Sequence, residues 1–207
     1  MPSLFTLFVP AALLILHSPM IAAAQEFSGV LDTPEADRWN YGFNATPGAK
    51  PTGSTFGYTG TLYEFDDRDG LVAIAFDTSM IATPGAGAEN YVIDALVVSI
   101  VVSDDFIAGY DETTDEWNTY VPEEDLEYLP DLDEGRPVEL YATDFRNGFS
   151  LATWEEATPF SPTGPFGERT RNAFAAECLN DGTLIDISNS IFERFTPTSL
   201  AVGQAIG

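Results

Sequence analysis

Apolar residues that alternate with a period of two constrain the fold of this chain more than any other feature. The longest such segment, Tyr91–Ser103, carries Val, Ile, Leu or Ala on both faces, so we expect a strand that is buried on both sides. Leu71–Asp77 has the same character. Pro137–Thr143 alternates more cleanly, with one face expected to point inward and the other outward. The inward set is Val138, Leu140 and Ala142, and the outward set is Glu139, Tyr141 and Thr143.

Two weaker strands are expected at Thr55–Phe65 and Thr183–Ser188, and glycine and proline turns separate the segments. Arg169–Leu179 alone suggests a helix, because it is rich in alanine and Asn180–Gly182 would end it. Many strands with almost no helix predict an all-β fold, an antiparallel β-sandwich of jelly-roll type. About five or six strands can be assigned where a closed jelly roll needs eight, which leaves open that the sandwich is incomplete at its C-terminus.

Residues 1–24 have the pattern of an export signal. Leu4–Leu16 forms an apolar core, and Ala22-Ala23-Ala24 fits the small-residue sequence that signal peptidase recognises. We therefore expect cleavage after Ala24, a secreted or cell-surface location, and one β-sandwich domain over residues 25–207. The alternative is an uncleaved membrane anchor, but prolines interrupt the apolar run short of the roughly 20 residues that a bilayer span needs. No membrane insertion is expected after signal cleavage.

Removal of that signal would also remove His17, the only histidine of the chain. What remains has one cysteine, Cys178, and one lysine, Lys50. These residues cannot supply a Ser-His-Asp triad, a Cys-His pair or a histidine-ligated metal, so we expect no zinc, haem or nucleotide cofactor. A lone cysteine cannot close an intramolecular disulfide. The fold must then rely on packing or on bound ions, with Cys178 expected as a small buried apolar side chain.

The charge is strongly negative and unevenly distributed. The chain has 33 acidic residues against 8 basic ones, a net charge of −25, and residues 104–144 hold 15 of the acids with Arg136 as their single base. Such a surface repels nucleic acid and anionic membranes, so neither is expected as a partner. It attracts cations, and calcium is the candidate because hard cations bind clustered oxygen ligands. The simpler alternative is that the charge serves solubility in a salty medium.

A family resemblance enters between residues 69 and 102. Val72–Ser79 is an apolar strand that ends in Phe-Asp-Thr-Ser, Pro84-Gly85 forms a turn, and Ile93–Val98 begins the next alternating strand. This run resembles the DNRLRE-type jelly-roll domains of secreted and surface-attached bacterial proteins. The resemblance implies a jelly-roll fold and an extracellular or surface location. It carries no general set of catalytic residues.

Three clusters of aspartates are candidate calcium sites. Alternating aspartates ahead of a glycine can wrap oxygen atoms around the ion, as Asp66–Gly70 and Asp131–Gly135 would do, while a third group flanks a loop in residues 104–116. The candidate ligands are Asp66, Asp67, Asp69, Asp104, Asp105, Asp111, Asp115, Asp131 and Asp133. Each cluster also fits a plain turn. Two or more of them could converge at one end of a sandwich.

Aromatic residues suggest a second kind of site. Trp117, Asn118 and Tyr120 lie within the acidic segment, and aromatic faces stack on sugar rings while an amide binds their hydroxyl groups. These three are the candidate ligand-binding residues of a carbohydrate-binding module, whose partner would be an extracellular polysaccharide or a cell-surface matrix. Trp39 and Trp154 are instead expected to pack in the core or at its edge.

Paired carboxylates also admit glycoside hydrolysis, and residues 123–127 are acidic enough to suggest it. Acids this crowded usually form a solvated loop, without the apolar surroundings that raise one pKa selectively. We therefore predict no catalytic residue. The sequence favours a secreted, acidic, non-catalytic extracellular or cell-surface module that calcium stabilises, with a carbohydrate-binding module and a carboxylate-dependent glycan-active enzyme as the alternatives.

Overall fold

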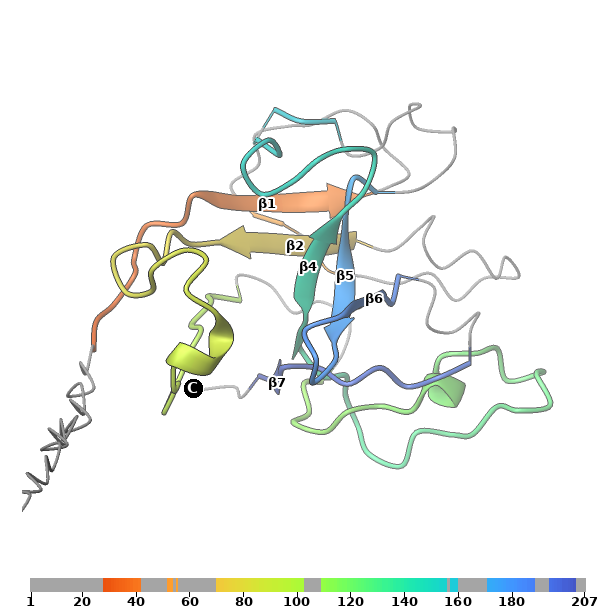
Figure 1. Ribbon diagram of the computed structural model, residues 1–207. Coiled ribbons are helices and arrows are strands. Elements are labelled where there is room, and N and C mark those ends of the chain that lie inside the picture. Colours follow the sequence, from red (N-terminus) through yellow and green to blue (C-terminus); the bar gives the residue numbers. More distant parts are fainter. Residues whose placement is uncertain are drawn as a thin grey trace, which may run out of the picture. The chain divides into compact units, whose positions relative to one another are not determined.

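The computed structural model describes residues 28–41, 52–53, 55, 70–102, 109–155, 157–159, 171–188 and 194–203 (Figure 1). The chain divides into two units, Met1–Val30 and Leu31–Gly207, and every element below belongs to the second. Within these ranges the regular structure is strand and short 3-10 helix, without an α-helix, which confirms the all-β class. The described residues also contain no helix whose length and hydropathy would suit a membrane span. The predicted signal, residues 1–24, and nearly all of Thr55–Phe65 lie outside them.

Strands β1 (Ala36–Tyr41) and β2 (Gly70–Ala75) form an antiparallel pair in which Ala36 lies opposite Ala75 and Tyr41 opposite Gly70. The strand predicted at Leu71–Asp77 is therefore confirmed, but its burial on both faces is not. Val72 and Ile74 remain 41% and 36% exposed, because a two-stranded ribbon leaves much of one face uncovered.

The second sheet places β5 (Ala173–Cys178) between β4 (Ala142–Phe145) and β6 (Leu184–Asp186). The helix predicted at Arg169–Leu179 is thus wrong. Ala173 and Ala176 are 1% and 0% exposed, so these small side chains allow close packing on the sheet, and pairing with two neighbours outweighs the helix propensity of alanine.

The strand predicted at Thr183–Ser188 is confirmed as β6. Cys178, expected to be buried, is exposed instead. It is the last residue of β5, where the chain turns back toward β6 and Leu179 N–H donates to the Thr183 carbonyl oxygen at 2.9 Å. The end of a strand lacks the covering neighbours that its centre has.

The third sheet pairs β3 (Glu139–Leu140) with β7 (Ala201–Val202). The strand predicted over Pro137–Thr143 is therefore split between β3 and β4, and its facing is partly wrong. Val138 and Leu140 are each 37% exposed, whereas Glu139 and Tyr141 are partly buried. The reason is the pairing of β3 with β7, in which Glu139 lies opposite Val202 on the more covered face of the ladder, while Leu140 lies opposite exposed Ala201. Ala142 and Thr143 face as predicted, with Thr143 exposed.

The largest departure from the sequence prediction concerns Tyr91–Ser103, whose residues 91–102 are described. They form no strand and are exposed throughout, with exposed fractions of 94% at Val101 and 90% at Val92. A period-two apolar pattern shows that a segment suits a buried strand, but burial requires a partner strand and a covering layer from elsewhere in the chain. Residues 91–102 belong to no strand ladder.

The interior that is described is rich in polar groups. Arg171, Asn40 and Asn172 are the largest side chains that are fully buried. The Asn40 side-chain amide donates to the carbonyl oxygen of Ala173 at 2.5 Å, so it links β1 to β5. A buried amide bonded to a main-chain carbonyl fixes the position of one sheet against the next more specifically than apolar contact does.

Arg38 on β1 makes a second link of this kind. Its guanidinium, 3% exposed, donates to the carbonyl oxygens of Glu155 and Thr158, and it lies 4.5 Å from the ring centre of Trp154. Trp154 is 4% exposed, which confirms its predicted place in the core, while Trp39 is partly buried. The Asn40 hydrogen bond therefore joins the first sheet to the second, and Arg38 binds β1 to residues that follow β4 in the chain. A closed sandwich is not among the described sheets.

Candidate metal centre

Two acidic loops, residues 109–116 and 131–136, meet side by side. Tyr110 and Arg136 form an isolated parallel β-bridge, and the backbone N–H of Arg136 donates to the Gly109 carbonyl oxygen at 2.9 Å. Gly135 allows this approach. Its φ is 131°, and a Cβ added to it would lie 2.7 Å from that same Gly109 oxygen. The backbone thus brings together two aspartate clusters that lie apart in the sequence. Convergence of two such clusters was one of the possibilities that the sequence left open.

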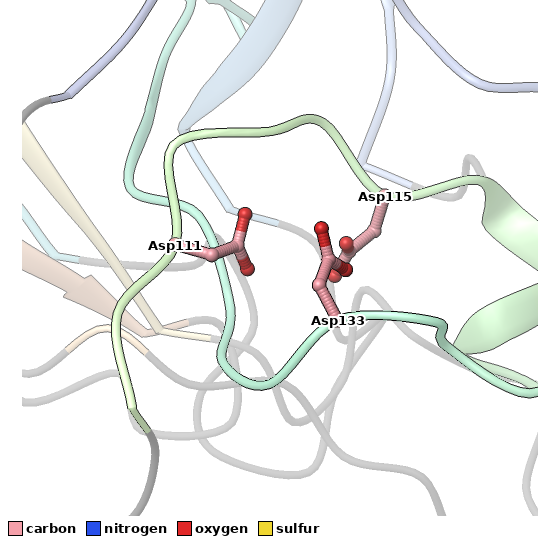
Figure 2. A group of neighbouring side chains, drawn as sticks. All are labelled: Asp111, Asp115 and Asp133. Carbon is pink, nitrogen blue, oxygen red and sulfur yellow. The ribbon is translucent and has the colours of Figure 1, made fainter.

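Asp111, Asp115 and Asp133 place one carboxylate oxygen each within 4.8 Å of one another, and Figure 2 shows their side chains converging between the two loops. Asp115 is buried, Asp111 partly buried and Asp133 exposed, so the cluster opens to solvent on the Asp133 side. These three groups could hold a metal ion.

Asp111 begins a tight turn. Its Oδ1 accepts the Thr113 N–H at 2.7 Å, and the Thr113 hydroxyl lies 2.8 Å from this oxygen and 2.9 Å from Asp133 Oδ2. A hydroxyl has one proton, so it can donate to only one of these two oxygens at a time. The other oxygen of Asp111, Oδ2, is buried and has no hydrogen-bond partner within the described part of the chain. The cluster therefore has more acceptor oxygens than donors.

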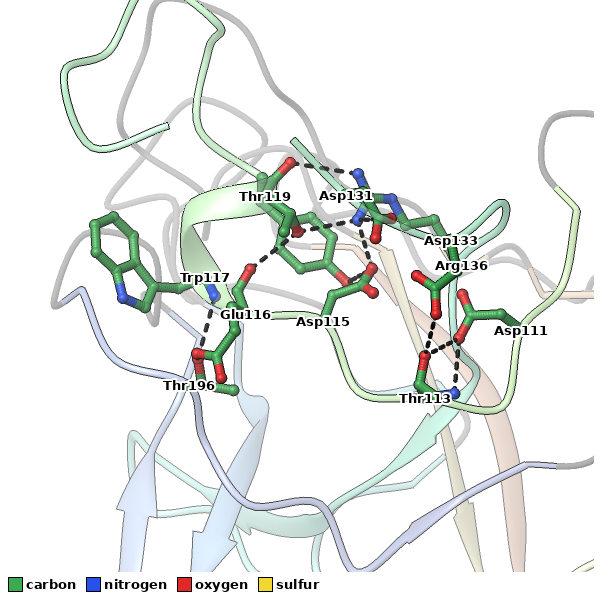
Figure 3. A network of polar contacts seen from close by, with 11 residues as sticks. Asp111, Thr113, Asp115, Glu116, Trp117, Thr119, Asp131, Asp133, Arg136 and Thr196 are labelled. Carbon is green, nitrogen blue, oxygen red and sulfur yellow. Dashed lines mark hydrogen bonds and ion pairs between the residues drawn. The ribbon is translucent and has the colours of Figure 1, made fainter. Parts of the chain in front are cut away.

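Asp115 is the most deeply buried acid of the group, with a side chain that is 2% exposed. It accepts a hydrogen bond from the Tyr120 hydroxyl at 3.1 Å and forms an ion pair with Arg136 (Figure 3). The same guanidinium lies 3.1 Å from Asp131, donates to the Thr119 hydroxyl at 3.0 Å and stacks on the Tyr120 ring at 4.6 Å. Arg136 thus compensates two of the aspartates.

The pKa shifts follow from these contacts. A hydrogen bond with Asp133, and then partial burial and the charge of Asp115, raises the pKa of Asp131. Hydrogen bonds from Thr113 and Asp131 lower the pKa of Asp133. Burial, followed by the charge of Asp115, raises the pKa of Tyr120 far above its ordinary value, so its phenol stays protonated and remains a donor.

The chemistry of the centre follows from its charge and its donor atoms. The centre holds four carboxylates, those of Asp111, Asp115, Asp131 and Asp133, and Arg136 forms ion pairs with Asp115 and Asp131. Calcium binds oxygen at about 2.3–2.6 Å, so two ligands on opposite sides of one ion lie up to roughly 5 Å apart. Oxygens within 4.8 Å of one another can therefore share an ion. All the side-chain ligands are oxygens, which suits a hard divalent cation.

Of the nine predicted metal ligands, four lie in this centre. The other five are outside the described residues: Asp66, Asp67, Asp69, Asp104 and Asp105.

The predicted sugar-binding residues lie beside the centre, on and after the 3-10 helix η2 (Trp117–Thr119). The Tyr120 ring contacts Arg136, whereas the Trp117 ring contacts Arg194, whose guanidinium carbon is 5.7 Å from its centre. The Trp117 indole also points away from the aspartates (Figure 3). Asn118, which lies between Trp117 and Tyr120 in the sequence, is partly buried. The two aromatic rings therefore do not contact the same arginine.

Sequence reasoning missed Thr113 and the role of Arg136. Thr113 had a local signal, because Asp-x-Thr is a typical side-chain-capped turn. The same turn recurs at Asp181, which accepts the Thr183 N–H at 2.9 Å. Arg136 was visible as the single base of residues 104–144. Its pairing with Asp115, 21 positions earlier, depends on how the two loops meet.

The chain matches no protein-family model, no curated protein and no solved structure. The geometry of the centre is therefore the basis on which a function is proposed.

Proposed function

We propose that this chain is an extracellular, non-catalytic module that calcium stabilises by binding between the two acidic loops. The observation that carries the proposal is Asp111 Oδ2, a buried carboxylate oxygen without a hydrogen-bond donor, beside the carboxylates of Asp115 and Asp133. A buried acceptor left unsatisfied costs about 1–3 kcal/mol, and more when it is charged. A cation that binds this oxygen offsets that cost.

Calcium fits better than magnesium for two reasons. Magnesium requires near-octahedral geometry at about 2.0–2.1 Å and loses its water reluctantly, whereas calcium accepts six to eight oxygens in irregular arrangements. The three aspartates and the Thr113 hydroxyl come from two loops without regular structure. Solvent on the side of Asp133, which is exposed, can supply the remaining ligands. Extracellular modules of this type bind calcium with dissociation constants of about 10⁻⁴–10⁻³ M.

Three features support the extracellular setting. The predicted signal at residues 1–24 directs export, and residues 69–102 resemble jelly-roll domains of secreted and surface-attached bacterial proteins. An antiparallel all-β chain suits that fold, which we propose for the whole domain. A single cysteine leaves the protein without an internal disulfide in an oxidising environment, so a bound ion would serve as its cross-link.

Thermal unfolding with and without calcium tests the proposal. We expect millimolar calcium to raise Tm relative to EGTA in the native protein, by an amount that grows with the logarithm of the calcium concentration. The Asp111→Asn variant should lose this shift. Glu124→Gln changes the charge equally at an exposed position outside the centre and should keep it. Potassium chloride at matched ionic strength controls for screening. An equal calcium shift in both variants, or none in the native protein, would rule out this site.

Carbohydrate binding is the second candidate, and one contact favours it. Trp117 is partly exposed and stands beside Arg194, so a sugar could stack on the indole while the guanidinium binds its hydroxyl groups. Glycan-array binding that Trp117→Ala abolishes, with the calcium shift retained, would establish this activity. Turnover of a polysaccharide that disappears on substitution of a single acid would instead support the enzyme alternative.

A further inference from the structure

We infer that the ion between the acidic loops controls the docking of residues 194–203, the segment that contains strand β7. Calcium would hold this segment in place, and its removal would release it. The inference rests on the proposed calcium centre and adds a regulated element to it.

The first attachment lies next to the ligand Asp111. The hydroxyl of the preceding residue, Tyr110, donates to the Gly203 carbonyl oxygen, while the Gly203 N–H donates to the Val138 carbonyl oxygen at 2.7 Å. Adjacent Cα atoms are about 3.8 Å apart, so a movement of Asp111 is transmitted to Tyr110.

The second attachment lies next to the ligand Asp115. The Thr196 hydroxyl donates to Glu116 Oε2 at 2.7 Å and accepts the N–H of Trp117 at 3.1 Å (Figure 3). Glu116 directly follows Asp115 in the chain. Both attachments of the segment are therefore within one or two residues of a metal ligand.

The remaining support for the segment is weak. The ladder between β3 and β7 has two residue pairs, Glu139 with Val202 and Leu140 with Ala201. Strands this short are not stable by themselves in water. At the other end, Arg194 pairs with Glu127, but the two side chains are 50% and 48% exposed, and such surface pairs contribute only about 0–1 kcal/mol.

Repulsion supplies the switch. Without a cation, the carboxylates of Asp111, Asp115 and Asp133 repel one another across the contact between the loops, and Arg136 balances only part of their charge. Separation of the loops moves Tyr110 and Glu116, which lie on the first loop, away from Val138 and strand β3, which follow the second loop, so the segment cannot keep its bonds to both sides. A bound cation removes the repulsion and restores them.

Hydrogen exchange of the whole protein, followed by mass spectrometry, tests this directly. The amides of Leu200 and Gly203, which donate to the Leu140 and Val138 carbonyl oxygens, should exchange at least tenfold more slowly in calcium than in EGTA. Amides of β5 serve as the internal reference and should change much less. In the Asp111→Asn variant, calcium should no longer change the exchange at residues 200–203.

A matched pair of variants separates docking from ion binding. Thr196→Val removes the hydroxyl that binds Glu116 and Trp117, whereas Thr198→Val makes the same change at an exposed position of the segment. We expect Thr196→Val alone to exchange rapidly in calcium, with calcium binding still measurable by calorimetry at an affinity about tenfold lower, because the coupling between docking and ion binding is reciprocal.

Two results would overturn the inference. Calorimetric calcium binding with unchanged exchange at residues 200–203 would refute it and leave the calcium site standing. Absence of calcium binding to the native protein would refute the proposed function, and the inference with it.

Discussion

Gly135 lies so close to Gly109 that a Cβ on Gly135 would be 2.7 Å from the Gly109 carbonyl oxygen. Gly135 has a φ of 131°, and the backbone N–H of the next residue, Arg136, donates to the same Gly109 oxygen. This hydrogen bond holds the two acidic loops together. The approach of the loops thus depends on the absence of a side chain at Gly135, and the candidate metal centre depends on that approach.

Gly135→Ala should therefore separate the loops. We expect a loss of about 3 kcal/mol or more in the free energy of unfolding, from backbone strain and steric overlap together, and a loss of calcium binding. Gly148→Ala is the matched control, because Gly148 has a φ of 80° but no atom within 4 Å of its added Cβ. It should cost about 1–2 kcal/mol from strain alone and retain calcium binding. Urea unfolding and calorimetry measure both quantities, and equal effects in the two variants would refute the steric explanation.

Arg136→Met should strongly destabilise the protein in the absence of calcium. It leaves the carboxylate of Asp115, 2% exposed, without its ion-pair partner; breaking a fully buried pair costs about 3–5 kcal/mol, which is an upper bound here because the Arg136 side chain is 38% exposed. Calcium should recover more stability in this variant than in the native protein, because it becomes the remaining counter-charge. Glu127→Gln breaks the exposed pair with Arg194 and should cost about 0–1 kcal/mol. A change under 1 kcal/mol in Arg136→Met would contradict the burial of Asp115.

Glu139→Gln should stabilise the protein at neutral pH. Burial, opposed by a hydrogen bond from Tyr141 and reinforced by the charge of Asp115, raises the pKa of Glu139. The folded state then holds the proton more tightly than the unfolded state, so Glu139 reduces stability as the pH rises above about 4.3, the ordinary value for glutamate. The variant and the native protein should have similar Tm values at pH 4, and the variant should be more stable at pH 7. Exposed Glu124→Gln should show no such divergence, and parallel curves for Glu139→Gln would refute the shift.

Local sequence signals identified part of this fold correctly. The alternation in Leu71–Asp77 and Thr183–Ser188 marked β2 and β6, and the acids of residues 104–144 include the three aspartates that the structure brings together. Both signals act over a few residues, since side-chain alternation and Asp-led turns depend on near neighbours. These two signals can be read without knowing which segments of the chain pack against each other.

The errors arose where distant segments decide the outcome. Residues 173–178 have the composition of a helix and form a central strand, because β4 and β6 pair with them on both edges. Glu139 was expected to face solvent, yet it is partly buried in strand β3, which pairs with the distant strand β7. The pairing of Asp115 with Arg136 likewise follows from the contact of two loops. None of these partners can be read from a local pattern.

Val101 offers the sharpest test of this difference. The alternating sequence predicts that it is buried, whereas the structure leaves it 94% exposed. A charge at an exposed position changes stability by about 0.5 kcal/mol at most, but a charge introduced into a core costs at least about 3 kcal/mol. Val101→Asp should therefore leave the urea midpoint nearly unchanged, while Val121→Asp, the same substitution at a position that is 7% exposed, should unfold much of the protein. If Val101→Asp were as damaging as Val121→Asp, residues 91–102 would have to lie under a covering layer, as their alternation alone suggests.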